Sequence, residues 1–280
     1  MYPELFQFTL GQNNITVSSY MFFGLLAFGY MLFAALFYLI RYYKVTLPKA
    51  LGLIILVAFS FFVGARLLYV FLYFSRVIDD PGIIVDLELR NFTLYGGLFL
   101  ALFSWWFLTR VSGLFLEGYS LAARLLPHVG IAVFIMRFGC LLNGCCYGKV
   151  TDIPWGINMP HLSPAHLTQI HTGSSKNFFT VAAVHPTQVY EMIAALLASA
   201  IAWTLLKKGE EVRKNLDYKA WNMVVIASFG LVFSLGRLIT FFYREFATAS
   251  EISNFVRGPI IYGLVSVVCM ILLVRIKEYK

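Results

Sequence analysis

Apolar residues in this chain gather into long continuous runs, which short polar segments separate. A helix that crosses a bilayer needs about 20 mostly apolar residues, so each run of that length predicts a membrane-spanning helix. Seven runs fit, although the third is short: Tyr20–Ile40, Leu51–Phe74, Leu94–Leu108, Leu121–Leu142, Pro186–Leu206, Trp221–Tyr243 and Pro259–Ile276. Because the runs are continuous and do not alternate with polar residues, they predict an all-α polytopic membrane protein and argue against a transmembrane β-barrel.

The loops between these predicted helices differ in charge. The loops after the first, third and fifth helices and the C-terminal tail carry most of the basic residues, for example Lys207 and Lys208, whereas the alternate loops hold more acids, for example Asp79 and Asp80. Positively charged loops remain in the cytoplasm. We therefore expect an N-terminus outside, a cytoplasmic C-terminus and a single integral-membrane domain, with an outer loop region at about residues 143–185.

The composition supports the same class of protein. Hydrophobic residues make up 60% of the chain and charged residues 13%, and the mean hydropathy is +0.76. A soluble domain needs more polar surface than this. The formal net charge of +8 does not indicate nucleic-acid binding, because the basic residues gather at the ends of apolar runs and form no single patch.

Four charged residues lie within the apolar runs and more than three positions from either end, namely Arg66, Arg137, Glu191 and Arg237. A charge at membrane depth is costly unless it is paired or faces a polar cavity, so each is a candidate functional residue. Arg66 has an equally good alternative, because an arginine near a helix end can extend to the headgroups. Glu191 can pair with one arginine. At least one cation then remains to bind an anion, and in a membrane the obvious anion is a lipid phosphate.

The segment from Met136 to Val150, MRFGCLLNGCCYGKV, combines an arginine, an asparagine, three cysteines and three glycines at the end of an apolar run. Asparagine and paired glycines after an arginine predict that the helix breaks into a polar turn that can receive an anion. A second glycine pair, in YGGL (Tyr95–Leu98), is a weaker signal, because glycine in membrane helices usually allows close helix packing.

Five segments in order resemble the prolipoprotein diacylglyceryl transferase family of bacterial plasma membranes. They are GARLLYV (Gly64–Val70), YGGL (Tyr95–Leu98), RFGCLLNGCCYGKVTDIPWGI (Arg137–Ile157), HPTQVYE (His185–Glu191) and GRLITFFYRE (Gly236–Glu245). The resemblance implies a transferase that moves the diacylglyceryl group of phosphatidylglycerol onto the cysteine thiol of a prolipoprotein signal peptide. Glycerol 1-phosphate leaves, and the site faces the extracytoplasmic side of the inner membrane. It implies no cofactor.

The resemblance also implies roles for individual residues. Arg137 would bind the lipid phosphate, and Arg237 would stabilise the charge of the leaving group. Asn143, Gly144 and Gly148 would shape the headgroup pocket. The remaining positions that match family motifs are expected to contribute to substrate binding: Gly96, Gly97, Arg66, His185 and Glu191.

The chain departs from the family pattern at its acid and base groups. Tyr95 stands where the family has a catalytic histidine, Cys140 replaces an asparagine, and Cys145 replaces a glutamate; Phe233 takes the place of an aromatic hydroxyl. A phenol near two cations could act as a hydrogen-bond donor or base, which makes Tyr95 a candidate catalytic residue. We expect Tyr95 to matter more for turnover than either Cys145 or Cys146.

The cysteines leave several alternatives open. Buried cysteines often serve as small apolar side chains. A disulfide would fit an oxidising compartment. Cys145 could also be a catalytic thiolate, because the cation of Arg137 would lower its pKa. A metal site with His185 or the loop histidines is a further alternative, but the spacing of those histidines is not typical of metal ligands, and we expect no metal ion.

Two functions therefore compete on sequence grounds. The first is transfer of a diacylglyceryl group, or a closely related lipid transfer to another acceptor. The alternative is a thiol-redox or metal-handling membrane protein built on the same scaffold, because the histidine and the glutamate of the family are replaced.

Overall fold

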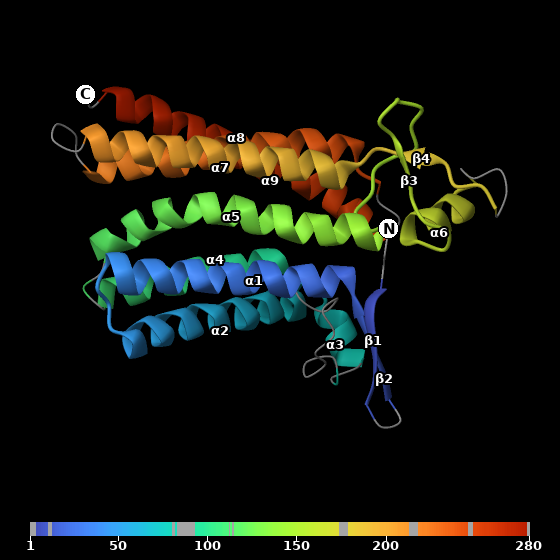
Figure 1. The fold of residues 1–280 in the computed structure, drawn as a ribbon, viewed down its shortest axis with the longest axis horizontal. Coiled ribbons are helices and arrows are strands. Elements are labelled where there is room, and N and C mark those ends of the chain that lie inside the picture. Colours follow the sequence, from blue (N-terminus) through green and yellow to red (C-terminus); the bar gives the residue numbers. More distant parts are fainter. Residues whose placement is uncertain are drawn as a thin grey trace. The chain divides into compact units, whose positions relative to one another are not determined.

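The computed structural model describes residues 4–10, 13–79, 82, 93–111, 113, 115–173, 179–212, 218–245 and 249–278. The fold is mostly helical, as the apolar runs predict (Figure 1). Its long helices are α1 (Ser19–Phe37), which a short π-helix (Tyr38–Tyr42) extends, α2 (Leu47–Leu72), α4 (Leu94–Val111), α5 (Phe115–Asn143), α7 (Thr187–Val212), α8 (Tyr218–Tyr243) and α9 (Ala249–Glu278).

Within the described ranges, six helical segments are long and apolar enough to cross a membrane: Ser19–Tyr42, Leu47–Leu72, Gly118–Asn143, Thr187–Gly209, Lys219–Tyr243 and Gly258–Arg275. The apolar part of α4, Gly96–Val111, is shorter. The prediction of an all-α polytopic membrane protein is confirmed. The seventh span and the orientation stay predictions.

Several helices are longer than the apolar runs that predicted them. α9 begins at Ala249 and not at Pro259, and α7 continues beyond Leu206 to Val212. A continuous apolar run marks only the part of a helix that lies in the hydrocarbon core of the membrane. Polar residues with good helix propensity extend the helix beyond the run on either side.

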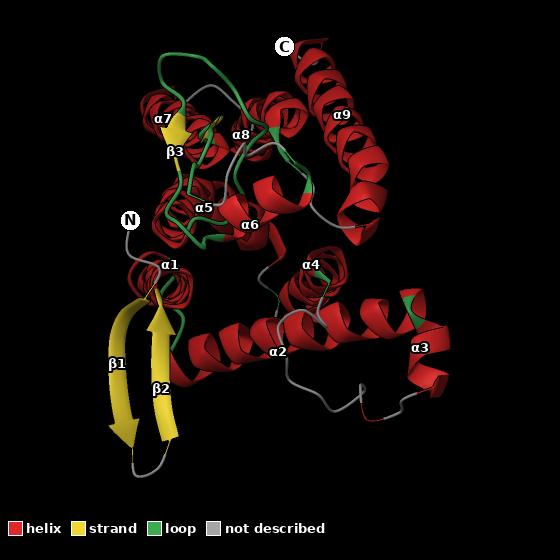
Figure 2. Cartoon of the chain, turned by 90° about the vertical axis from the view of Figure 1, so that its right-hand side faces the viewer, coloured by secondary structure: helices red, strands yellow, loops and turns green. Residues whose placement is uncertain are grey.

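Two small antiparallel sheets were not predicted. The hairpin of β1 (Glu4–Leu10) and β2 (Asn13–Ser18) pairs Phe6 with Val17 and precedes α1 (Figure 2). The second sheet pairs β3 (Ile157–Asn158) with β4 (Ala183–Val184) in the outer loop region. Strands β3 and β4 have two residues each, too few for a period-two signal. In β1 the residues Phe6–Leu10, FQFTL, do alternate apolar and polar, so that signal was present and the sequence analysis missed it.

The chain separates into two compact units, of residues 1–31 with 123–280 and of residues 32–122. The predicted single membrane domain stays a prediction. In the second unit α2 packs on α4, and the short helix α3 (Phe74–Asp79) follows α2. A Cβ on Gly64 would meet the carbonyl oxygen of Gly96, and one on Gly97 would lie 2.7 Å from the Phe61 ring. These glycines therefore allow the two helices to approach closely.

In the first unit α8 packs against both α7 and α9. Small side chains bring the helices together: a Cβ on Gly236 of α8 would meet Ala194 of α7, and one on Gly130 of α5 would meet Ser199 of α7. An apolar core forms among α5, α7 and α8, built on Ala123, Ala198, Ala202, Val225 and Phe229. This packing fixes the three helices that carry Arg137, Glu191 and Arg237.

The outer loop region has a core of its own at the end where α5 finishes and α7 begins (Figure 1). Tyr147 packs with Met159, Ala165 and Val184, around the short helix α6 (Pro164–His171). The Tyr147 hydroxyl donates to Thr168 Oγ1 at 2.6 Å. The region is therefore a folded cap and not a simple connector.

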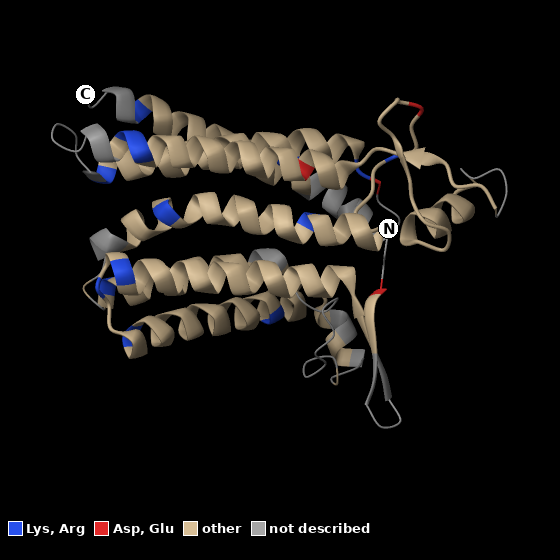
Figure 3. Cartoon of the chain, viewed as in Figure 1, with Lys and Arg blue, Asp and Glu red and all other residues tan. Residues whose placement is uncertain are grey.

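Charges in this unit are distributed unevenly along the helices. In Figure 3 the lysines and arginines of α7, α8 and α9 lie mostly toward the helix ends remote from β3, α6 and β4. These residues are Lys207, Lys208, Lys219 and Arg275. The orientation that the loop charges predicted, with these ends in the cytoplasm, stays a prediction.

Candidate active site

Glu191 in the second turn of α7 binds two arginines at once. One carboxylate oxygen pairs with Nε of Arg137 on α5, and the other pairs with Nη1 of Arg237 on α8. All three side chains are largely buried, with exposed fractions of 5%, 12% and 15% for Glu191, Arg137 and Arg237. The prediction that Glu191 pairs with an arginine is confirmed for both of them. Two guanidinium groups on one carboxylate leave the group with one net positive charge.

Tyr262 of α9 provides the second contact for Arg237. Its hydroxyl accepts hydrogen bonds from Arg237 Nη2 at 3.0 Å and Nε at 3.3 Å, and the guanidinium lies 5.3 Å from the ring centroid. The arginine is thus held between a carboxylate and an aromatic ring, which fixes its direction. Sequence analysis missed Tyr262, because a tyrosine within an apolar run gives no signal that distinguishes it from a packing residue.

Helix α5 ends in a turn that the sequence encodes directly. Gly144 has a φ of +71°, its N–H donates to the carbonyl of Leu141, and the N–H of Cys145 donates to the carbonyl of Cys140 at 3.1 Å. These two bonds around a left-handed glycine are the Schellman motif, which ends helices and folds the following residue back over the last turn. A Cβ on Gly144 would also lie 3.2 Å from Ser163. Gly144 therefore has a backbone role, and its predicted role in binding the headgroup stays a prediction.

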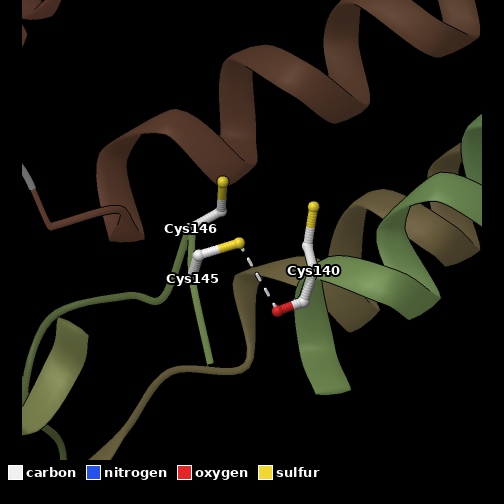
Figure 4. A group of neighbouring side chains, drawn as sticks. All are labelled: Cys140, Cys145 and Cys146. Atoms are coloured by element: carbon white, nitrogen blue, oxygen red, sulfur yellow. Dashed lines mark hydrogen bonds between the residues drawn. The ribbon is translucent and has the colours of Figure 1, made fainter. Parts of the chain in front are cut away.

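The turn brings three thiols together. Cys140 comes from the last turn of α5, and Cys145 and Cys146 come from the loop that follows it (Figure 4). The three sulfur atoms all lie within 4.8 Å of one another. Cys140 is fully buried, whereas Cys145 and Cys146 are half-buried. All four cysteines of the chain are free thiols, with Cys269 alone in α9.

Polar contacts link the thiols to the arginine site and hold the turn. Arg137 Nη1 donates to the sulfur of Cys140 at 3.7 Å, so Arg137 contacts both the carboxylate of Glu191 and the thiol cluster. The carbonyl of Cys145 accepts from Gln188 Nε2 at 2.7 Å. The carbonyl of Cys146, whose own φ is +60°, accepts from Thr187 Oγ1 at the same distance. The start of α7 therefore positions the cysteine turn.

Electrostatics distinguishes Cys146 from an ordinary thiol. Hydrogen bonds from the thiols of Cys140 and Cys145, and then the nearby cations of Arg244 and Arg137, hold the pKa of Cys146 well below its usual range against the effect of burial. Asn143, another predicted site residue, ends α5 two positions before Cys145, and its role in shaping the headgroup pocket stays a prediction.

Gly148 and His185 pack against each other beside this turn. A Cβ on Gly148 would lie 2.6 Å from both His185 Cβ and the carbonyl oxygen of Tyr243, so only glycine fits. His185 Nδ1 lies 3.2 Å from the Tyr190 hydroxyl. Burial, and then the cation of Lys149, lower the pKa of His185, so the imidazole is neutral at pH 7. The structure places His185 in the loop scaffold.

The remaining predicted residues belong to the second unit. Arg66 is half-buried in α2, and Gly96 and Gly97 have the packing role described above. Tyr95 lies in the first turn of α4, but its side chain is outside the described residues. Its predicted place beside Arg137 and Arg237 therefore stays a prediction.

The fold and this site define a multi-pass membrane protein with a buried, net positive group that joins three helices. The sequence model of the family described as prolipoprotein diacylglyceryl transferase matches residues 6–276. The chain therefore belongs to the prolipoprotein diacylglyceryl transferase family, as the motifs predicted.

Curated relatives carry the name phosphatidylglycerol–prolipoprotein diacylglyceryl transferase. The protein of Clostridium tetani is 29% identical over 65% of this chain and 62% of its own length. That of Ectopseudomonas mendocina is 28% identical over 70% of this chain and 64% of its own length. One from Legionella pneumophila is 30% identical over 47% of this chain and 53% of its own length. The chain thus spans less than two thirds of the length of these relatives.

Proposed function

We propose that this protein transfers the diacylglyceryl group of phosphatidylglycerol to the cysteine thiol of a prolipoprotein signal peptide. Family membership supports a lipid transferase, and the names of the relatives supply the donor and the acceptor. Neither supports redox chemistry or metal handling as the principal activity, which was the alternative on sequence grounds.

The observation that carries the proposal is the net positive charge of the buried arginine–glutamate group. A cation in an apolar environment is stable only with an anion nearby. Glu191 supplies one carboxylate for Arg137 and Arg237, so the arginine–glutamate group keeps one positive charge that an anionic ligand can neutralise. The phosphodiester of an anionic lipid carries the matching negative charge, and guanidinium groups bind phosphate through paired hydrogen bonds.

The same group can support the chemistry. When the bond between the lipid glycerol carbon and the phosphate oxygen breaks, the leaving phosphate gains charge. Arg137 would hold the phosphate of the bound lipid, and Arg237, which Tyr262 orients, would stabilise the charge that develops. Stronger binding of the more highly charged transition state is what accelerates the reaction.

We place the site at the extracytoplasmic face of the bacterial inner membrane. The arginine–glutamate group lies near the helix ends that adjoin β3, α6 and β4, and the lysine-rich ends of α7 and α8 are at the other extreme. By the positive-inside rule the lysine-rich ends are cytoplasmic. Secreted prolipoproteins present their signal-peptide cysteine at the opposite face.

The proposal is tested with the purified protein in lipid nanodiscs. A peptide that carries a signal-peptide cysteine should gain the mass of one diacylglyceryl group when the discs contain phosphatidylglycerol, with equimolar release of glycerol phosphate. With phosphatidylcholine as the sole lipid, transfer should fall by on the order of tenfold or more, because a zwitterion does not neutralise the net positive site. Mass spectrometry measures both products. Peptide that stays unmodified in phosphatidylglycerol discs would refute the proposed donor and acceptor.

A further prediction concerns Tyr95, which replaces the histidine of the family. If its phenol donates a hydrogen bond or accepts a proton during transfer, Tyr95→Phe should reduce turnover by on the order of a hundredfold. Tyr69→Phe, in the neighbouring helix α2 of the same unit, is the matched control and should retain activity. Steady-state rates in the nanodisc assay check both. Equal rates for Tyr95→Phe and the wild type would exclude Tyr95 from the chemistry.

A further inference from the structure

The three clustered thiols have no role in the transfer chemistry described so far. Their arrangement is nonetheless built into the fold. The Schellman turn fixes Cys145 against Cys140, the left-handed backbone of Cys146 turns its thiol to the same side, and α7 side chains hold both of their carbonyls. A side-chain cluster held this firmly, with one buried and two half-buried members, has the form of a binding site.

We infer that Cys140, Cys145 and Cys146 bind a Zn²⁺ ion whose fourth position is open to the acceptor thiol. The inference rests on the proposed function, because the acceptor in that reaction is itself a thiol. The sequence predicted no metal ion, and it predicted that Tyr95 matters more for turnover than Cys145 or Cys146. In this inference the geometry of the three thiols gives the cysteines a direct part in the reaction.

The distances suit this ion. In a tetrahedral zinc site with Zn–S bonds of about 2.3 Å, two sulfur atoms are about 3.8 Å apart. The three sulfurs here already lie within 4.8 Å of one another, so small side-chain rotations complete the geometry. Thiolate ligands select zinc, copper(I) or iron–sulfur clusters. Iron–sulfur clusters usually take four cysteines, and alkylation of a thiol involves no change of oxidation state, which favours Zn²⁺.

The number of ligands and their exposure indicate a catalytic site. Structural zinc sites are closed by four protein ligands, whereas catalytic sites have three and keep one position for substrate. Cys140 is a buried residue, whereas Cys145 and Cys146 are half-buried, so an acceptor would approach the cluster from the side of these two residues. Zn²⁺ with three thiolates has one net negative charge, and the nearby cation of Arg244 can offset it, so the positive charge of the arginine–glutamate group remains for the lipid phosphate.

A metal ion at this position would activate the acceptor thiol in a chain that lacks the histidine and glutamate of the family. The thiolate is the nucleophilic form of a thiol, and a thiol that binds a metal ion loses its proton. Arg137 contacts both the cysteine cluster and Glu191, so the acceptor sulfur and the lipid phosphate would meet at this residue. That proximity is what an intermolecular displacement needs.

The reaction balances without an added reactant. The acceptor sulfur gives up its proton on binding and uses an electron pair to form a bond to the glycerol carbon of the lipid. The bond from that carbon to the phosphate oxygen breaks, and its electron pair leaves with glycerol phosphate, which takes up one proton. The thioether product then dissociates, because an alkylated sulfur is a weak ligand. A thiol of the protein could not relay the lipid in this way, since its own thioether would be an end product.

The first test measures metal binding apart from activity. Full-length protein in nanodiscs should contain about one zinc ion per chain. Substitution with Co²⁺ should give the absorption of a thiolate-bound tetrahedral ion. Cys145→Ala and Cys146→Ala should each lower the affinity by at least about tenfold. Cys269→Ala, which removes the remote cysteine of α9, is the matched control and should bind like the wild type. Wild-type protein that binds neither ion would overturn the inference.

The second test asks whether the acceptor thiol occupies the open position. Adding the signal-peptide cysteine peptide should strengthen the sulfur-to-cobalt absorption of the wild type, whereas the same peptide with serine in place of cysteine should not. Chelation of the wild-type protein should reduce transfer at pH 7 by at least about tenfold, and Zn²⁺ should restore it. This arm needs no variant, so a folding defect in a cysteine variant cannot obscure the result.

The outcomes separate the two proposals. Zinc and peptide-thiol binding without any lipid transfer would support the metal site and contradict the proposed function. Transfer that survives both chelation and the cysteine substitutions would support the proposed function and overturn the metal site. Arg137→Ala should bind the ion yet transfer little lipid, since its guanidinium acts on the phosphate.

Discussion

Arg137→Ala should lower lipid-dependent turnover by on the order of a hundredfold to a thousandfold, the range seen when one group that stabilises transition-state charge is removed. The protein should still insert and fold, because Glu191 keeps Arg237 as its partner. Arg137→Lys should restore little of the rate, since an ammonium group cannot reproduce the planar paired hydrogen bonds of a guanidinium. Initial rates in phosphatidylglycerol nanodiscs provide the measurement.

The matched control for this prediction is Arg275→Ala, which removes an exposed arginine near the end of α9. Its rate should equal that of the wild type. If Arg137→Ala and Arg275→Ala both transfer lipid at the wild-type rate, Arg137 does not bind the phosphate, and the buried ion pair has a purely structural role.

Glu191→Ala should be the most destabilising single substitution in the site. It leaves two buried guanidinium groups without their shared carboxylate, and breaking a buried ion pair from one side typically costs about 3–5 kcal/mol. An anionic phosphate can replace the lost carboxylate. The melting temperature of Glu191→Ala should therefore fall strongly in phosphatidylcholine discs and recover in part in phosphatidylglycerol discs.

Glu4→Ala serves as its control, because Glu4 is an exposed carboxylate in β1 and its loss should change the melting temperature little in either lipid. The lipid dependence is the decisive measurement. A Glu191→Ala protein that melts at the same temperature in both kinds of disc would show that anionic lipid does not reach the two arginines.

The spanning helices and the ion pairs could be predicted from the sequence, for related reasons. Long apolar runs have few structural alternatives in a membrane, and a lone charge in such a run requires a partner. Glu191 was the one acidic residue available in the apolar runs, so its pairing followed. That it binds two arginines could not be foreseen, because this depends on how closely α7 approaches α8 at Ala194 and Gly236.

The cysteine cluster shows where sequence reasoning stopped short. The sequence predicted that the helix breaks into a polar turn after Arg137, and the structure ends α5 at Asn143, but that prediction did not say that the turn brings the three thiols together. A signal was present: Gly144 is the residue that a Schellman motif needs after a helix, and the motif places the next residue over the last turn. That local rule would have brought Cys145 to Cys140. The position of Cys146 depends on contacts with Thr187, which lies far along the chain.

The shared ion pair also constrains how the chain is made. Translation delivers α5, with Arg137, to the membrane before α7 supplies Glu191, and α8 brings Arg237 last. We therefore expect α5 to keep Arg137 in a hydrated or protein-lined environment until Glu191 arrives, since an unpaired arginine inside an apolar span is costly. Ribosome-bound intermediates that end before α7 would therefore carry Arg137 without Glu191, and the three-residue group can form only once α8 has followed α7 into the membrane.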